Sequence, residues 1–196
     1  MSWLPLESNP DNLGPSIVSS VPFCVFQYLQ SLGVPASWQI VDVYGLEEEL
    51  LSTVPQPVIA VMLLFPTSDK YEEHKNQQEE ELKKGGNEVS DKVYYLKQVV
   101  SNACGTIALI HSVANNTENQ WEIGENPEFG APGKEACRID LKDGDLKKFL
   151  EESAGMSPEE RGKKLLEAEG IINTHKEVAQ EGQTEVGINY LYSRMF

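Results

Sequence analysis

Basic residues are scarce in this chain of 196 residues. Lysine and arginine number 16 against 31 aspartates and glutamates, which gives a formal net charge of −15. Binding to phosphates needs a surplus of positive charge, so the composition argues against a nucleic-acid partner. An acidic surface favours solubility and attracts basic partners, although much of this charge is expected on any solvated face.

Cysteine is also scarce, with Cys24, Cys104 and Cys137 and no paired spacing among them. An odd, sparse count argues against a disulfide framework and against a zinc site. We expect no metal and no cofactor. A reducing compartment suits such a chain.

Long apolar runs are absent. Val58–Phe65 is too short to span a bilayer, and Leu13–Val34 is interrupted by Pro15, Pro22 and Gly33. The first residues, MSWLPLESNP, lack the charged start and apolar run of a signal peptide. These features, with no heptad pattern, predict a soluble cytoplasmic monomer without a membrane partner.

Helix signals recur along the chain. Phe26–Leu32 is amphipathic and closed by Gly33, and Asp145 is placed to cap LKKFLEES. Ser157–Glu160 has the pattern of a capping box that opens a helix to about Gly170. A short helix is expected at Gly45–Ser52.

Two segments have strand patterns. Gln39–Tyr44 alternates apolar and polar residues, and Pro57–Pro66 is a continuous apolar run typical of a buried strand. Lys70–Lys84 is so charged that it predicts a solvated helix or a mobile segment, and Asn115–Gly144 is expected to be a long loop. Strands mixed with amphipathic helices indicate the α/β or α+β class in one domain.

Cys104 lies where a reactive thiol would be expected. A thiol attacks a carbonyl as its thiolate, which a helix N-terminus can stabilise. Asn102 is a good cap residue, Gly105 leaves room for substrate, and the residues after it predict a buried helical surface made by Ile107, Ala108, Ile110, Val113 and Ala114. The amide of Gln98 could donate to an oxyanion. Alternatively, Cys104 is a small buried hydrophobe and Gln98 a surface residue.

The segment QVVSNACGTIALIH at Gln98–His111 resembles the active-site segment of the small ubiquitin C-terminal hydrolases. Other matching pieces follow the order of that family: WLPLESNP, WQIVDVYGLEEELLSTVPQPVIAVMLLFP, LKKFLEESAGMSPEER and EGQTE. Together they cover most of residues 1–10, 27–116 and 145–185.

The resemblance implies a papain-like cysteine hydrolase fold, with helices packed around a central, mostly antiparallel sheet. It implies Cys104 as the nucleophile and Gln98 as the oxyanion-hole residue. The substrate would be an ester, amide or small adduct at the C-terminal glycine of ubiquitin, or of a ubiquitin-like modifier, cleaved through a thioester. The basic C-terminal tail of ubiquitin suits an acidic surface.

The resemblance also implies two segments that contact ubiquitin, one near the start of the chain and one in the crossover loop that arches over the family's active site. Their residues are Pro5, Leu6, Glu7, Ser8, Asn9 and Pro10, and Ala179, Gln180, Glu181, Gly182, Gln183, Thr184, Glu185 and Val186.

The chain departs from the family in its general base. His111 is about 10 Å along the helix from Cys104, His74 lies in the charged run, and His175 matches a position before the loop. The family's base His and partner Asp follow the loop in strands that read roughly LHFIAL and HLYELDG, whereas this sequence continues VGINYLYSRMF. We therefore expect impaired hydrolysis. There are two alternatives: a ubiquitin-binding protein without turnover, and a partly folded product without ubiquitin function.

The resemblance gives one catalytic domain over residues 1–196 that is incomplete at its C-terminal end. Residues 13–25 and 120–140 would be insertions, and residues 186–196 a tail foreign to the family. Without the later strands, the apolar run at Pro57–Pro66 would face water or pair with another chain. The tail at Ile188–Phe196 could take the place of one lost strand.

Overall fold

A computed structural model describes residues 3, 21–66, 68–85, 90, 92–117, 138–181 and 190–193. The described elements, in chain order, are α1 (Val21–Ser31), α2 (Glu48–Leu51), β1 (Leu63–Pro66), α3 (Asp69–Gly85), α4 (Cys104–Ala114), α5 (Asp145–Ser153), α6 (Pro158–Leu165), α7 (Glu169–Glu181) and β2 (Tyr190–Ser193).

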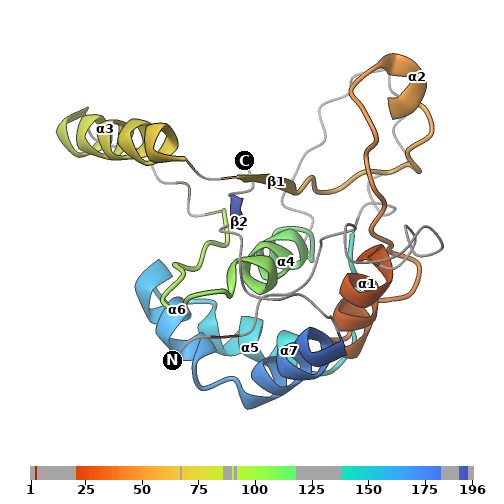
Figure 1. Cartoon of the computed structure of the whole chain (residues 1–196). Helices are drawn as coiled ribbons and strands as arrows, with labels where there is room; N and C mark the ends of the chain where they lie inside the picture. The colour runs from red at the N-terminus through yellow and green to blue at the C-terminus, as the bar shows by residue number, and fades with distance from the viewer. Residues whose placement is uncertain are drawn as a thin grey trace.

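Helix α4 lies at the centre of a helical body, with α1, α5, α6 and α7 around it (Figure 1). The core is contiguous and takes apolar side chains from each of these helices and from the segments that join them. The innermost of these side chains, each almost wholly removed from water, are Tyr28, Leu32, Leu96, Ile110, Leu146, Leu165 and Ile171. Burying them supplies most of the driving force for packing the helices together.

Local signals place several helix ends where the sequence predicts them. Helix α1 is followed by Gly33, whose φ of 101° is the left-handed conformation that favours glycine after a helix. The capping box before α6 is confirmed, because the Ser157 hydroxyl accepts from the Glu160 N–H and the Glu160 carboxylate accepts from the Ser157 N–H. Helix α5 differs by one residue, since Gly144 is its N-cap and Asp145 its first residue.

The helix expected to run from Ser157 to about Gly170 is two helices. Helix α6 ends at Leu165, and α7 begins at Glu169 after a short turn. Helix α7 then runs to Glu181, through a stretch whose polar composition gave no helix signal. Tertiary packing stabilises this helix, because Ile171, His175 and Ala179 lie four residues apart on one face and are all buried.

Of the two predicted strands, one is absent from the described structure and the other is shorter than predicted. Gln39–Tyr44 forms no strand in the described structure, and only the last four residues of Pro57–Pro66 do so, as β1. Strand β1 pairs antiparallel with β2, with Leu63 opposite Ser193 and Pro66 opposite Tyr190. The tail thus supplies a partner strand, and the described sheet has these two strands.

Apolar side chains of this region face water, as expected for strands without cover. Tyr44 is 75% exposed, Val61 66% and Leu63 63%. A strand is stabilised by partners on its edges and cover on its faces, and the described residues provide little of either here. The larger central sheet stays a prediction.

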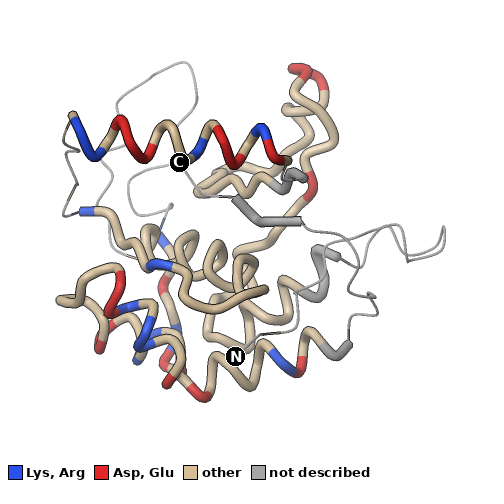
Figure 2. The backbone as a smooth tube through the Cα atoms, turned by 60° about the vertical axis from the view of Figure 1, so that its left-hand side comes forward, with Lys and Arg blue, Asp and Glu red and all other residues tan. Residues whose placement is uncertain are grey.

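Helix α3 is solvated, as its composition predicts. It buries none of its residues and lies away from the helical body (Figure 1). Acidic and basic residues alternate along it, and further acidic residues lie at the tip around α2 and on α5 and α6 (Figure 2). Among the described helices, none combines the length and apolarity that crossing a membrane requires.

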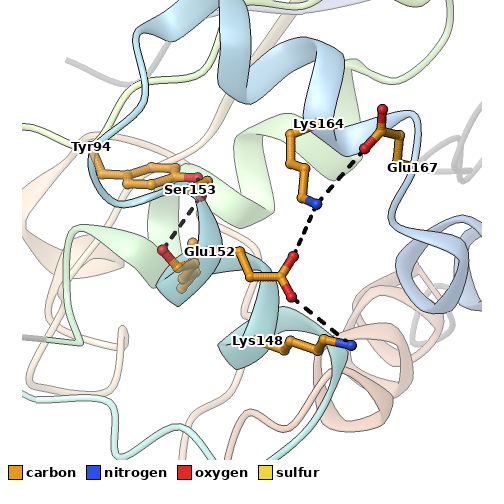
Figure 3. Close-up of polar contacts among 7 residues, drawn as sticks. Tyr94, Lys148, Glu152, Ser153, Lys164 and Glu167 are labelled. Atoms are coloured by element: carbon orange, nitrogen blue, oxygen red, sulfur yellow. Dashed lines mark hydrogen bonds and ion pairs between the residues drawn. The ribbon is translucent and has the colours of Figure 1, made fainter.

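An ion-pair chain joins α5 to α6 at the surface (Figure 3). The Glu152 carboxylate lies 3.1 Å from the Lys164 ammonium and 4.0 Å from that of Lys148, and Lys164 also lies 3.8 Å from Glu167. Lys148, Glu152 and Glu167 are exposed and Lys164 is half-buried, so each pair lies near water and contributes little stability. On its other side, α6 contacts residues 95 and 97 of the segment that leads toward Cys104.

Candidate active site

Cys104 lies in the first turn of α4, as the sequence predicts, and is the first residue of that helix, but the cap differs. Ala103 is the N-cap and makes no side-chain capping bond. Asn102 instead adopts a left-handed conformation with φ 63°, which asparagine tolerates better than most residues. Its side-chain Nδ2 donates to the Trp3 carbonyl, 3.0 Å away. Asn102 therefore turns the chain into the helix rather than capping it.

The first turn of α4 presents N–H groups beside the thiol. The first intrahelical bond runs from the Ile107 N–H to the Ala103 carbonyl. The preceding amides of Cys104, Gly105 and Thr106 thus lie at the positive end of the helix. An anion formed at the Cys104 sulfur or beside it would be stabilised there. Cys104 is 8% exposed.

The rest of α4 is driven into the core. Of the predicted buried surface, Ile107, Ile110 and Val113 are buried, whereas Ala108 and Ala114 are half-buried. Leu109 is buried as well, so core surrounds more of the helix than the sequence pattern indicates. A helix held on so many sides gives Cys104 a fixed backbone position.

The segment Tyr94–Lys97, which is neither helix nor strand, leads to Gln98 and is held on one side by α4. Asn115, the C-cap of α4, makes paired bonds with Tyr94: its Oδ1 accepts from the Tyr94 N–H at 2.8 Å, and its Nδ2 donates to the Tyr94 carbonyl at 2.9 Å. The Leu96 N–H donates to Nε2 of His111, 3.1 Å away. Side chains of α4 thus bind alternate residues of this segment as a neighbouring strand would.

Helix α6 holds the other side of Tyr94–Lys97. The Lys97 N–H donates to the Pro158 carbonyl at 2.9 Å, and Nη1 of Arg161 donates to the Tyr95 carbonyl at 3.0 Å. The Arg161 guanidinium also lies 4.3 Å from the centre of the Tyr94 ring. The Tyr94 hydroxyl is 2.7 Å from the Ser153 hydroxyl (Figure 3). Burial raises the pKa of Tyr94, so the phenol is neutral at physiological pH.

Gln98 follows directly on this segment. Its side-chain Nε2 donates to the Val100 carbonyl at 2.7 Å, a local bond that bends the chain toward Asn102. The structure therefore fixes the backbone that carries Gln98, while its amide is engaged with that same backbone.

The three histidines are all described. His74 is exposed on α3, as predicted. His111 is the partnered core residue that the sequence predicts, and burial lowers its pKa to about 4, so the ring is neutral at pH 7. His175 is buried on α7, with Nδ1 2.8 Å from Oγ1 of Thr106. No described hydrogen bond joins any of these rings to Cys104.

The contact between His175 and Thr106 was not predicted from the sequence. The available signal was the spacing of His175 with Ile171 and Ala179, which places the ring on the buried face of a helix. Its partners come from distant parts of the chain, so sequence spacing alone could not find them.

The predicted ubiquitin-contacting segments fall mostly outside the described residues. Pro5–Pro10 and Gly182–Val186 lie outside, and Gln180 and Glu181 contribute described backbone at the end of α7. Ala179 is buried in the core, which leaves its side chain little surface for a partner. Among the described residues, no group of three or more His, Cys, Asp or Glu is placed to hold a metal ion.

Comparison with known proteins places this arrangement in a family. Residues 3–190 match the family described as ubiquitin carboxyl-terminal hydrolase, family 1. The chain belongs to this family. Its members are cysteine-type ubiquitinyl hydrolases, which agrees with the resemblance at Gln98–His111.

Relatives with this name match nearly the whole chain. A ubiquitin carboxyl-terminal hydrolase of Drosophila melanogaster is 39% identical over 94% of this chain and 67% of its own length. The human isozyme L1 is 42% identical over 95% of this chain and 69% of its own length. A probable hydrolase of Dictyostelium discoideum is 39% identical over 94% of this chain and 61% of its own length. This chain therefore spans about two thirds of the length of these relatives.

The fold agrees with that of the family. The crystal structure of the Trichinella spiralis UCH37 catalytic domain, bound to ubiquitin vinyl methyl ester, superposes with a TM-score of 0.56 at 19% identity. The match covers 98% of this chain and 68% of that one. A likeness at this identity shows the ubiquitin C-terminal hydrolase fold alone.

Gly162 gives a test of how α6 holds the segment before Gln98. A Cβ at Gly162 would collide with the Lys97 carbonyl oxygen and lie 3.2 Å from Val99 Cγ1. Gly162→Ala should therefore force α6 away from the segment and lower the free energy of unfolding by about 2 kcal/mol. Urea denaturation followed by circular dichroism measures this change. Gly155→Ala is the matched control, because its Cβ would meet nothing within 4 Å; equal effects of the two variants would contradict the packing argument.

His111 predicts a pH dependence of stability. Its pKa is about 4 in the folded chain against 6.5 when solvated, so the unfolded chain binds the proton first as the pH falls. Its stabilising contribution is complete above pH ~6.5 and decreases by about 3 kcal/mol as the pH falls to ~4.

His111→Gln keeps an acceptor for Leu96 but does not titrate in this range. The difference in unfolding free energy between wild type and His111→Gln should therefore shrink as the pH is lowered across this interval. Carboxylates are common to both proteins and cancel in the difference. Urea titrations at a series of pH values test this, and a difference independent of pH would show that His111 is not held neutral by burial.

Proposed function

We propose that this chain acts on the C-terminal glycine of ubiquitin with Cys104 as the nucleophile. The observation that carries the proposal is the position of Cys104, at the first residue of a buried helix whose N-cap, Ala103, follows the left-handed Asn102. This places the thiol beside the amides of the first turn, where a thiolate is stabilised. The family match across residues 3–190 makes ubiquitin the partner that this thiol would meet.

The proposed chemistry is acyl transfer. The Cys104 thiolate attacks the carbonyl carbon of the terminal glycine, and the oxyanion of the tetrahedral intermediate accepts hydrogen bonds. Collapse of this intermediate expels the leaving group, which takes up a proton, and leaves a thioester on Cys104 that water then hydrolyses. Gln98 is the candidate donor to the oxyanion. Its amide would exchange its bond with the Val100 carbonyl for one with the oxyanion.

We also propose that turnover is slow in this chain. Proton transfer from the thiol and to the leaving group needs a base within hydrogen-bond reach. His74 is exposed on α3, the Nε2 of His111 is occupied by Leu96, and the Nδ1 of His175 faces Thr106. The same observation favours the second candidate function, binding of ubiquitin without hydrolysis.

The remaining features of the proposal concern the whole chain. We infer one catalytic domain over residues 1–196 with additional residues at 13–25 and 120–140, acting as a monomer in the cytoplasm. The central antiparallel sheet of the fold, and the contact of Pro5–Pro10 and residues 179–186 with ubiquitin, belong to the same proposal.

Labelling by ubiquitin vinyl methyl ester tests the nucleophile. This electrophile needs a positioned thiolate but no protonated leaving group, so wild type should form a covalent adduct at Cys104 and Cys104→Ala should form none. Intact mass and peptide mapping measure the adduct. Cys24→Ser and Cys137→Ser are the matched thiol controls; a wild type that stays unlabelled would contradict the nucleophile role.

Calorimetric titration of Cys104→Ala with ubiquitin separates the two candidate functions. Saturable heat, together with no detectable hydrolysis of a fluorogenic ubiquitin amide by wild type, favours binding without turnover. Hydrolysis that disappears in Cys104→Ala favours the enzyme. Absence of heat would remove ubiquitin as a partner.

The oxyanion role of Gln98 predicts a loss in the acylation step. An activated ubiquitin ester needs little proton assistance, so its cleavage reports oxyanion stabilisation even where a base is lacking. Gln98→Ala should lower kcat/KM for this ester about 100-fold, because one hydrogen-bond donor to the oxyanion is lost. Stopped-flow fluorescence measures the rate, and Gln77→Ala on the exposed α3 is the control. An unchanged kcat/KM in Gln98→Ala would assign the oxyanion to the backbone amides alone.

A further inference from the structure

A buried polar cluster lies behind the first turn of α4. It consists of Tyr28 from α1, Thr106 from α4, His175 from α7 and Trp3 from the N-terminal segment. Tyr28 and Thr106 are fully buried and His175 is 1% exposed. Polar side chains removed from water in this way require hydrogen-bond partners, so the four segments are held in one arrangement.

On one side of the nucleophile, the cluster holds Thr106, two residues after Cys104. The Thr106 hydroxyl accepts a hydrogen bond from the Tyr28 hydroxyl at 3.2 Å and shares a second, at 2.8 Å, with Nδ1 of His175. Burial raises the pKa of Tyr28, so its phenol stays protonated and able to donate. These two bonds fix the first turn of α4 against α1 and α7.

On the other side of the nucleophile, the cluster holds the turn before Cys104. The Trp3 ring packs on the His175 ring with centroids 4.6 Å apart. The Trp3 backbone N–H donates to the Ser101 carbonyl at 3.1 Å, and its carbonyl accepts from Asn102 Nδ2 at 3.0 Å. Asn102 is held in a left-handed conformation that the free chain adopts rarely, so this contact helps to maintain the turn.

His175 therefore contacts the structure that precedes Cys104, through Trp3, and the structure that follows it, through Thr106. We propose that His175 is a positioning residue for the Cys104 thiol. It acts through Thr106 and Trp3, and Nδ1 is directed to Thr106 rather than to the sulfur. This inference rests on the proposed function of Cys104 as the nucleophile.

Positioning predicts a specific kinetic change. In His175→Phe an aromatic ring remains against Trp3 but the hydrogen bond to Thr106 is lost. The maximal rate of labelling by ubiquitin vinyl methyl ester should fall about tenfold or more, because a small displacement of a reacting group has a large effect on rate. The concentration of probe that gives half this rate, and the calorimetric Kd for ubiquitin, should change less than about twofold, because neither depends on the thiol geometry.

Two further variants separate positioning from folding. His175→Asn keeps a hydrogen-bond acceptor near the place of Nδ1 and should recover part of the maximal rate. Thr106→Val removes the same bond from the other side, together with the bond from Tyr28, and its effect combined with His175→Phe should be less than additive. His74→Phe, on the exposed α3, is the matched control and should label at the wild-type rate. All rates are measured well below the melting temperatures recorded by circular dichroism.

These measurements test the positioning role of His175. An unchanged maximal rate in folded His175→Phe overturns the inference and leaves the nucleophile in place, as does a rate in His175→Asn no better than in His175→Phe. If His175→Phe does not fold, Thr106→Val takes its place: an unchanged maximal rate of labelling in this variant overturns the inference. A wild type that is not labelled at Cys104 overturns the proposed function itself, and the inference with it.

Discussion

Burial of α4 is the constraint on which the rest of the described structure depends. Eight of its eleven residues are buried, from Cys104 in the first turn to Val113 near the end. The apolar residues supply the driving force, and the polar ones, Thr106 and His111, are buried with partners. A helix enclosed to this degree has little freedom to shift or rotate, so its first turn is a stable place for a thiol.

The same helix also places the segment that carries Gln98. The side chains of His111 and Asn115, at the other end of α4, bind the backbone of Leu96 and Tyr94. Backbone groups that would otherwise be buried without partners are satisfied by side chains rather than by a second strand. One element therefore sets the position of the thiol and of the candidate oxyanion donor, and α6 supports the outer edge of that segment through Pro158 and Arg161.

Features set by neighbouring residues could be predicted from the sequence, whereas features set by distant residues could not. The capping box at Ser157, the helix after Gly105 and the end of α1 at Gly33 depend on local chemistry, and the structure has them. A strand at Gln39–Tyr44 depends on a partner elsewhere in the chain, and in the described structure none pairs with it.

The site shows the same division. Cys104 and Gln98 could be proposed from one short segment, because their chemistry and spacing lie within it, and their roles stay predictions. The conformation of Asn102 could not be predicted, because its side chain donates to the backbone carbonyl of Trp3, 99 positions away in sequence. His175 has a buried, partnered place in the core that depends on the packing of α1, α4 and α7.

The helical body and the exposed apolar region make different contributions to function. The first turn of α4, which carries Cys104, is held by α1 and α7 within a contiguous core. Residues 41–63 carry many exposed apolar side chains and contribute little to that core. The helical body thus determines where the Cys104 thiol lies, whereas the described histidines are engaged elsewhere or exposed: His111 binds Leu96, His175 binds Thr106 and His74 is exposed on α3.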